Sequence, residues 1–204
     1  MKTLHLIIAA LLIFCGVILP QTLAEMQVDY RWTGQYLSEL GATGAPHAGI
    51  MNNFGFLPAG VLWAAALFLL IRRVGGGATF VAGALLLMGT SISYIGAYFF
   101  PCDLGCPIEG SEKQFMHNTL GLVGYLTAPF GFVLVASQFF RSRQSNLGAL
   151  SALAAVLVSL GFLMMASAVD ASLKGAWQRL ADFTLFFWLL AVAWNIKDVE
   201  QPTT

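Results

Sequence analysis

The chain has 204 residues, of which 58% are hydrophobic and 10% are charged, and its mean hydropathy is +0.76. This apolar share exceeds that of a soluble globular domain, and a formal net charge of zero gives no indication of nucleic-acid binding, which needs a basic face. Apolar runs of about 20 residues, the length that crosses a bilayer core, recur along the chain. We predict an all-α, polytopic membrane helix bundle that forms a single domain over residues 1–204, with a short polar tail at 197–204.

About six transmembrane helices are expected, covering residues 4–22, 52–71, 78–100, 116–140, 147–168 and 178–196. The first run also resembles a signal peptide, with a basic start at Lys2 and small residues up to Ala24. Its apolar stretch is long, and Pro20 and Gln21 do not favour a cleavage site. We therefore favour a retained helix over a cleaved peptide.

The segment EMQVDYRWTGQYLSELGATGAPHAGIMNN joins the first two spans. Four of its apolar residues have the spacing of one helical face: Trp32, Tyr36, Leu37 and Leu40. This pattern predicts an amphipathic helix at the level of the lipid headgroups, where Trp and Tyr are enriched. Ser38 and Glu39 then project either into solvent or inward to a pocket. A Ser–Glu pair alone does not indicate a nucleophile, which also needs an activating base.

Residues 99–121, FFPCDLGCPIEGSEKQFMHNTLG, concentrate polar chemistry between the third and fourth spans. Cys102 and Cys106 lie in a loop that we expect to face an oxidising compartment, so we predict a disulfide. A zinc site is an alternative, formed by the two cysteines and His117 with His47 or Asp103 as the fourth ligand. A thiol–disulfide relay coupled to a quinone is a second alternative, although such a relay normally needs a second cysteine pair.

His117 begins the fourth predicted span. Four residues follow it at spacings that share its helical face: Gly121, Gly124, Tyr125 and Ala128. Small residues allow helices to approach closely in lipid, so this face is expected to pack against a neighbouring helix with His117 pointing inward. The imidazole then either bonds to Asp103 or Glu39 or takes part directly in chemistry.

The segment AVDASLKGAWQRLADF precedes and enters the last span. Asp170 and Lys174 are four residues apart, and Arg179 and Asp182 are three apart, so each pair can form a local ion pair on a helix. Asp182 lies one turn inside the span, where an unpaired carboxylate is costly. Arg179 or His117 is its expected partner.

Charged residues predict the orientation, because Lys and Arg are retained on the cytoplasmic side of short loops. The inside is assigned six basic residues: Lys2, Arg72, Arg73, Arg141, Arg143 and Lys197. With this assignment the inside has six basic and two acidic residues, and the outside has four basic and eight acidic residues. Both termini are therefore expected in the cytoplasm of a cell, with the protein in the plasma membrane. The longer, chemically richer loops then face outward.

Three stretches together resemble one known family: DYRWTGQYLSELGATGAP, AGIMNNFGFLPAGVLWAA and FFPCD, the last followed by His117. The chain is similar over about residues 5–195 to the domain-of-unknown-function 998 family of bacterial and archaeal integral membrane proteins. The most specific marks are Ser38-Glu39-Leu40-Gly41, the stretch from Asn53 to Gly60, Phe100-Pro101-Cys102-Asp103 and His117. The resemblance implies a multi-pass membrane protein and brings no established reaction.

Three functions are compatible with these patterns. We favour a ligand-binding, sensing or assembly role for a polar pocket at the outer face, with these candidate ligand-binding residues: Ser38, His47, Asn53, Tyr125 and Arg179. The alternative is a membrane-embedded hydrolase or transferase that acts on lipid headgroups, with these candidate catalytic residues: Glu39, Asp103, His117 and Asp182. A transporter is less favoured because no charge lies near the middle of a span. The expected partners are the bilayer and a lipid or small-molecule ligand, with no metal, cofactor or nucleic acid.

Overall fold

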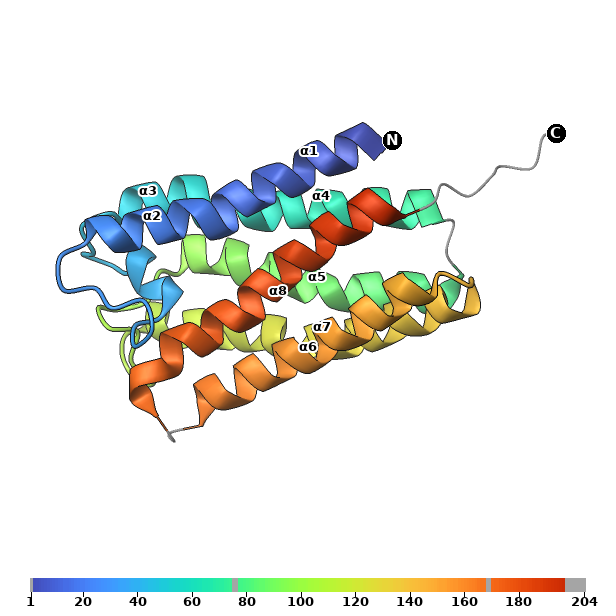
Figure 1. Ribbon diagram of the computed structural model, residues 1–204. Coiled ribbons are helices and arrows are strands. Elements are labelled where there is room, and N and C mark those ends of the chain that lie inside the picture. Colours follow the sequence, from blue (N-terminus) through green and yellow to red (C-terminus); the bar gives the residue numbers. More distant parts are fainter. Residues whose placement is uncertain (1, 75–76, 168–169, 197–204) are drawn as a thin grey trace.

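The computed structural model describes residues 2–74, 77–167 and 170–196, and the predicted tail at 197–204 lies outside them. The described part of the chain is helical and contains no strand. Its helices form six long, roughly antiparallel rods (Figure 1). Each of the first two rods is two α-helices joined by a π-helical turn: α1 Lys2–Ile13, the turn Phe14–Ile18 and α2 Leu19–Met26 in the first, and α3 Ala48–Ile50, the turn Met51–Phe56 and α4 Leu57–Val74 in the second. The other four rods are single helices: α5 Ala78–Phe99, α6 Glu112–Arg141, α7 Ser145–Ala166 and α8 Lys174–Asn195. The predicted all-α bundle is confirmed.

Five of the rods are long and apolar enough to cross a membrane by length and composition: Lys2–Met26, Ala48–Val74, Ala78–Phe99, Glu112–Arg141 and Ser145–Ala166. The sixth, α8, has the same length as α5 but is less apolar, because it carries Lys174, Arg179 and Asp182. It packs against α7 on one side and α1 on the other. The chain is thus a multi-pass membrane protein, in agreement with the prediction of about six membrane helices.

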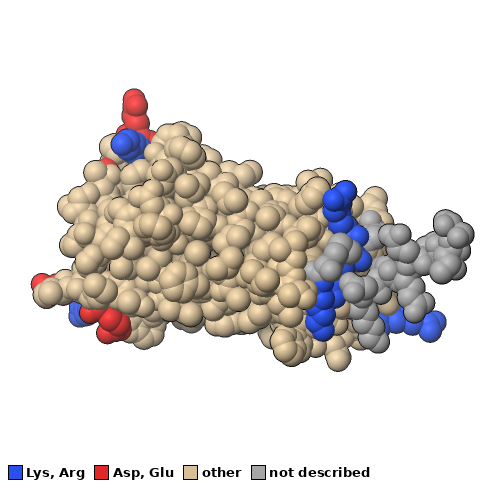
Figure 2. Space-filling model, turned by 90° about the horizontal axis from the view of Figure 1, so that it is seen from above, with Lys and Arg blue, Asp and Glu red and all other residues tan. Residues whose placement is uncertain are grey.

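Charge separates strongly between the two ends of the bundle (Figure 2). One end holds Lys2, Arg72, Arg73, Arg141 and Arg143, and the opposite end holds the eight acidic residues of the described chain. The first and last helices return to the same basic end, where the Lys2 ammonium lies 5.7 Å from the centre of the Trp194 ring. Which end faces the cytoplasm stays a prediction. Lys197, Asp198 and Glu200, which entered that prediction, lie outside the described residues.

The first helix is integrated into the bundle. It packs against α4 and α8, and Ala9 and Leu12 are fully buried. Near the acidic end of the bundle Gln21 accepts a 2.8 Å hydrogen bond from the side chain of Arg179 on α8. These contacts favour the retained helix over a cleaved signal peptide.

The loop between the first two spans differs from its prediction. In place of an amphipathic α-helix, residues 27–36 form turns, and a short 3-10 helix follows at Leu37–Gly41. Side chains satisfy the backbone carbonyls of this loop: the Tyr30 hydroxyl, within the loop, donates to the Tyr36 carbonyl at 2.8 Å, and Arg179 on α8 donates to the carbonyls of Trp32 and Gln35. Because these carbonyls bond to side chains, they are not free for the repeating bonds of an α-helix. The apolar spacing predicted the wrong element here.

Helices α5 and α6 approach most closely where glycines face one another. A Cβ atom added at Gly131 would lie 2.8 Å from the Gly83 carbonyl oxygen, and one added at Gly83 would lie 2.9 Å from the Gly131 carbonyl oxygen. Such close backbone packing is the usual way membrane helices associate, since lipid provides no hydrophobic drive between them. Gly124 and Ala128 also pack inward on this side of α6, as predicted from their spacing.

Gly131→Val should therefore destabilise the bundle by about 1–3 kcal/mol, because the added atoms meet backbone that cannot rotate away. The melting temperature of the purified protein in detergent measures this effect. Gly121→Val on the same helix is the matched control, since a Cβ there meets nothing within 4 Å. Equal melting temperatures for the two variants would contradict the close α5–α6 contact.

Candidate functional site

A cavity of about 420 Å³ lies at the acidic end of the bundle, between α5, α6, α7, α8 and the two long loops. Its walls are mostly apolar and include Phe56, Leu122, Phe162 and Met165. Polar side chains enter it from several elements: Ser38, Tyr94, His117, Asn118, Tyr125, Gln178 and Asp182. Segments far apart in the sequence thus contribute to one polar-lined space.

Asp182 is the most unusual of these groups, because its side chain is only 4% exposed although it is a carboxylate. Its Oδ1 accepts a 2.9 Å hydrogen bond from the Tyr125 hydroxyl, and the Tyr125 ring stacks on Phe162 at 5.5 Å. The predicted partners, Arg179 and His117, are wrong: within the described chain neither forms an ion pair with Asp182. The partner is a neutral hydroxyl from α6, whose position depends on the packing of α6 against α7.

The side chain of Arg179 bonds to the loop between the first two spans. It is 2% exposed, and its guanidinium donates to the carbonyls of Trp32 and Gln35 at 2.8 and 3.0 Å and to the Tyr30 hydroxyl at 2.7 Å. Burial raises the pKa of Tyr30 even though the adjacent Arg179 lowers it, so the hydroxyl stays neutral and donates a hydrogen bond to the Tyr36 carbonyl. Arg179 thereby fixes the first outer loop onto α8.

Glu39 is also occupied by the loop that contains it. Its Oε1 accepts the Tyr36 amide at 2.9 Å and lies 3.7 Å from the Lys174 ammonium, and its Oε2 accepts the side chain of Gln35 at 3.1 Å. Burial and the Glu39 charge raise the pKa of the neighbouring Tyr36. Lys174 thus pairs with Glu39, and the predicted local pair with Asp170 is wrong.

Asp170 instead caps the short 3-10 turn Ala171–Leu173, where bonds from the Ser172 hydroxyl and amide lower its pKa.

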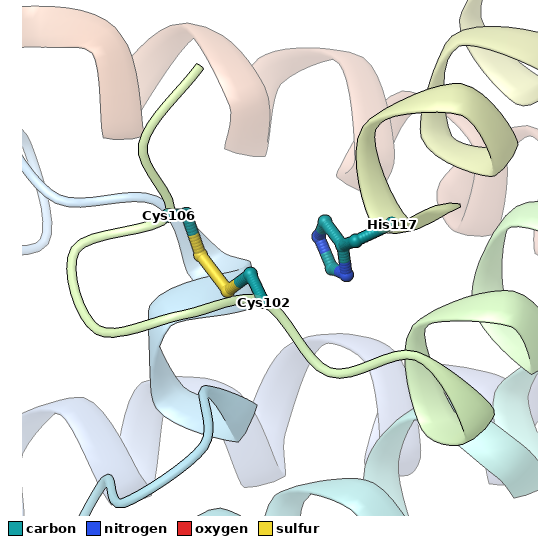
Figure 3. A group of neighbouring side chains, drawn as sticks. All are labelled: Cys102, Cys106 and His117. Carbon is teal, nitrogen blue, oxygen red and sulfur yellow. A yellow bond between two sulfur atoms is a disulfide. The ribbon is translucent and has the colours of Figure 1, made fainter. Parts of the chain in front are cut away.

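The second outer loop is closed by the predicted disulfide between Cys102 and Cys106 (Figure 3). The Ser38 hydroxyl donates to the Cys106 sulfur at 3.3 Å, so the disulfide links the two outer loops. The imidazole of His117 lies beside it, and its Nδ1 donates to the Phe100 carbonyl at 2.9 Å. That bond places a proton on Nδ1 and leaves Nε2 for another partner.

The same three residues form the one metal-compatible group found among the described residues, with ligand atoms of Cys102, Cys106 and His117 within 4.8 Å of one another. Neither His47 nor Asp103, the fourth ligands considered from the sequence, belongs to this group. Cysteine binds zinc as a thiolate, so the disulfide and a zinc site are mutually exclusive states of this trio.

Asp103 braces the second outer loop. It accepts hydrogen bonds from the Ser111 amide and hydroxyl, each at 2.8 Å. Both bonds lower the pKa of Asp103, and the bond from the amide has the larger effect. Gln114, which is fully buried, accepts the Asp103 amide at 2.8 Å and donates to the Pro107 carbonyl at 2.6 Å. The carboxylate of Asp103 is therefore directed to its own loop, and Asp103 is not among the residues that line the cavity.

The structure brings together Ser38, Tyr125, His117 and Asp182 of the candidate residues, and it separates the others from the cavity. Asn53 is exposed and donates to the Gly49 carbonyl of its own helix at 2.8 Å, while its neighbour Asn52 reaches the Gly41 carbonyl at 3.0 Å. His47 is half-buried at the start of α3 and does not line the cavity.

Sequence reasoning missed four polar residues of the site: Ser93, Tyr94, Asn118 and Gln178. Asn118 and Gln178 each adjoin a residue that was singled out, and Gln178 accepts the Leu37 amide at 2.6 Å. Tyr94 lies within an apolar span and gave no signal beyond its hydroxyl. Its hydroxyl is buried without a hydrogen-bond partner in the described chain.

A family model described as protein of unknown function (DUF998) matches residues 7–195, which is nearly the whole chain. The chain belongs to this family. No curated protein and no solved structure matches it. Membership of the DUF998 family confirms the resemblance drawn from the sequence, and the function has to be argued from the geometry of the cavity.

Arg179→Lys should destabilise the protein by about 2–4 kcal/mol, because lysine keeps the charge but cannot reproduce the planar fork that bonds several acceptors. The freed loop should also be cut faster by trypsin at Arg31, which is already exposed. Melting temperature and the rate of cleavage measure the two effects. Arg141→Lys, an exposed position at the basic end, is the control. A normal melting temperature and cleavage rate in Arg179→Lys would contradict the anchoring role.

Proposed function

We propose that this DUF998 protein binds a small, largely apolar ligand in the cavity at the outer face of the plasma membrane, in a ligand-binding, sensing or assembly role. The cavity itself is the observation that carries the proposal. Its volume of about 420 Å³ falls in the range of ligand sites, which combine apolar walls with a few convergent polar groups. A lipid or a small molecule that partitions into the bilayer fits this description.

Two features support an outward-facing cavity. The opposite end of the bundle carries Lys2, Arg72, Arg73, Arg141 and Arg143, and basic residues of this kind are retained in the cytoplasm. The loop beside the cavity contains the Cys102–Cys106 disulfide, and disulfides persist in oxidising compartments outside the cytoplasm. The distribution of basic residues and the disulfide are independent observations, and both favour the same orientation.

Binding fits the geometry better than hydrolysis or group transfer. Of the four candidate acid–base residues, His117 and Asp182 line the cavity, whereas Glu39 and Asp103 accept backbone amides of their own loops. The hydroxyl of Ser38 donates to a disulfide sulfur and, among the described residues, forms no hydrogen bond to a base that could activate it as a nucleophile. The polar groups of the cavity are arranged to hold a ligand in place.

Orientation can be tested on intact cells with a membrane-impermeant maleimide. Cys102 and Cys106 should remain unlabelled until an impermeant reductant is added, and should then label strongly, because the loop faces outward and is oxidised. Cys15, which is buried in the first span, should stay unlabelled throughout. Labelling that requires permeabilised cells would contradict the orientation, and labelling without reductant would contradict the disulfide.

Ligand binding can be tested by filling the cavity. Gly121 lines the cavity and an added Cβ there meets no atom within 4 Å, so Gly121→Phe should occupy the space without unfolding the bundle. Mass spectrometry of protein extracted with its surrounding lipid should find a co-purifying compound in the wild type and lose it in Gly121→Phe. Gly49→Phe, at an equally open glycine outside the cavity, should retain it. Identical bound compounds in all three proteins would overturn the proposal.

A further inference from the structure

Asp182 sets the charge of the cavity. Its Oδ1 is bonded to Tyr125, and its second oxygen, Oδ2, accepts no hydrogen bond from the described residues. A buried carboxylate is costly unless a cation or several donors compensate it. Within the described chain Asp182 has no ion-pair partner, and no described Lys or Arg lines the cavity. The compensation available from the protein comes from two phenols, Tyr125, which is bonded to Oδ1, and Tyr94, which lies close to the carboxylate.

Tyr94 provides a second, independent sign that something polar binds at this point. Its side chain is 7% exposed, it lines the cavity, and its hydroxyl has no hydrogen-bond partner in the described chain. It lies close enough to the Asp182 carboxylate for the two groups to interact, so both face the same part of the cavity. A buried hydroxyl without a partner costs free energy, and native structures seldom leave one unless a ligand or water completes it.

The surrounding rings define the chemistry further. Five aromatic residues line the cavity: Tyr36, Phe56, Tyr94, Tyr125 and Phe162. The faces of aromatic rings attract cations, and the Lys174 ammonium already lies 4.2 Å from the centre of the Tyr36 ring. A phosphate or carboxylate, in contrast, would meet Asp182 without any Lys or Arg among the described lining residues. The site therefore discriminates by charge: it favours a cation and disfavours an anion.

We propose that the ligand carries a primary ammonium group, which donates hydrogen bonds to Asp182 Oδ2 and to the Tyr94 hydroxyl while its apolar part lies against Phe56, Leu122 and Phe162. This inference rests on the proposed ligand-binding function and specifies its substrate class. A primary ammonium has three N–H donors and can satisfy both acceptors at once, whereas a quaternary ammonium has the charge but no donor. An aminophospholipid headgroup and a free alkylamine share this chemistry.

The test uses the full chain in nanodiscs of phosphatidylglycerol, which supply no amine. Unfolding is followed by the reaction of Cys15, the free cysteine, with a fluorogenic maleimide. Hexylamine at about 100 times its Kd should raise the melting temperature by roughly 5–10 °C. Hexanol, hexanoate and hexyltrimethylammonium should produce much smaller shifts. Replacing part of the lipid by phosphatidylethanolamine tests the lipid source, and phosphatidylcholine is its quaternary control.

Asp182→Asn should abolish the shift with hexylamine, because the amide keeps the shape and the bond to Tyr125 but loses the charge. Tyr94→Phe should weaken hexylamine binding about tenfold through loss of one hydrogen bond to a charged group. It also keeps the inference testable if Asp182→Asn does not fold. Asp170→Asn, an exposed aspartate outside the cavity at the same end, should behave like the wild type.

The outcomes separate this inference from the function on which it rests. A shift with hexylamine but not with phosphatidylethanolamine identifies a free amine as the ligand, and a shift with both identifies the lipid headgroup as a ligand too. Equal shifts with hexanol and hexylamine, or a shift that persists in Asp182→Asn, would overturn the amine inference while leaving ligand binding intact. No shift with any amine would overturn it as well. The co-purification experiment with Gly121→Phe decides the underlying function separately.

Discussion

The acidic end of this bundle depends on one buried guanidinium. Arg179 on α8 bonds to Gln21 of the first span, to the carbonyls of Trp32 and Gln35, and to the Tyr30 hydroxyl. These bonds satisfy loop backbone that would otherwise be buried without partners, and so determine the path of residues 27–36. The next residues, Leu37 and Ser38, line the cavity, and Ser38 in turn bonds to the disulfide beside His117. Removing the guanidinium would affect every later contact in this series.

The contrast between Arg179 and Asp182 shows how two charges three residues apart acquire separate roles. On an exposed helix such a pair would neutralise itself. Here the arginine bonds to the first outer loop, and the carboxylate faces the cavity, where Tyr125 is its partner. Each charge is consequently available to groups distant in sequence. Asp182 thus lines the cavity without a described Lys or Arg beside it in the lining, because the Arg179 guanidinium bonds to Gln21, to Tyr30 and to backbone carbonyls.

The parts of the structure that could be predicted from the sequence are those governed by local composition. Bilayer thickness sets the length of apolar runs, so the long helices could be predicted directly, and the position of Cys102 and Cys106 in a loop expected to face an oxidising compartment predicted their disulfide. The first outer loop could not be predicted from its own spacing, since its conformation depends on Arg179, which lies 147 residues from Trp32 in the sequence. Tyr94 could not be recognised either, because a tyrosine within an apolar span is usually part of the packed core.

The composition of α8 now has a physical explanation. It is less apolar than the five helices that are long and apolar enough to cross a membrane, yet its polar residues Gln178, Arg179 and Asp182 are buried. A helix can carry such groups in a membrane only where other protein segments provide their partners. In this bundle α1 and α7 flank α8, and the outer loop and α6 supply the bonds. The low apolar content of α8 therefore marks the helix on which the site is built, and polar residues within an otherwise apolar span are the feature to look for in other members of the family.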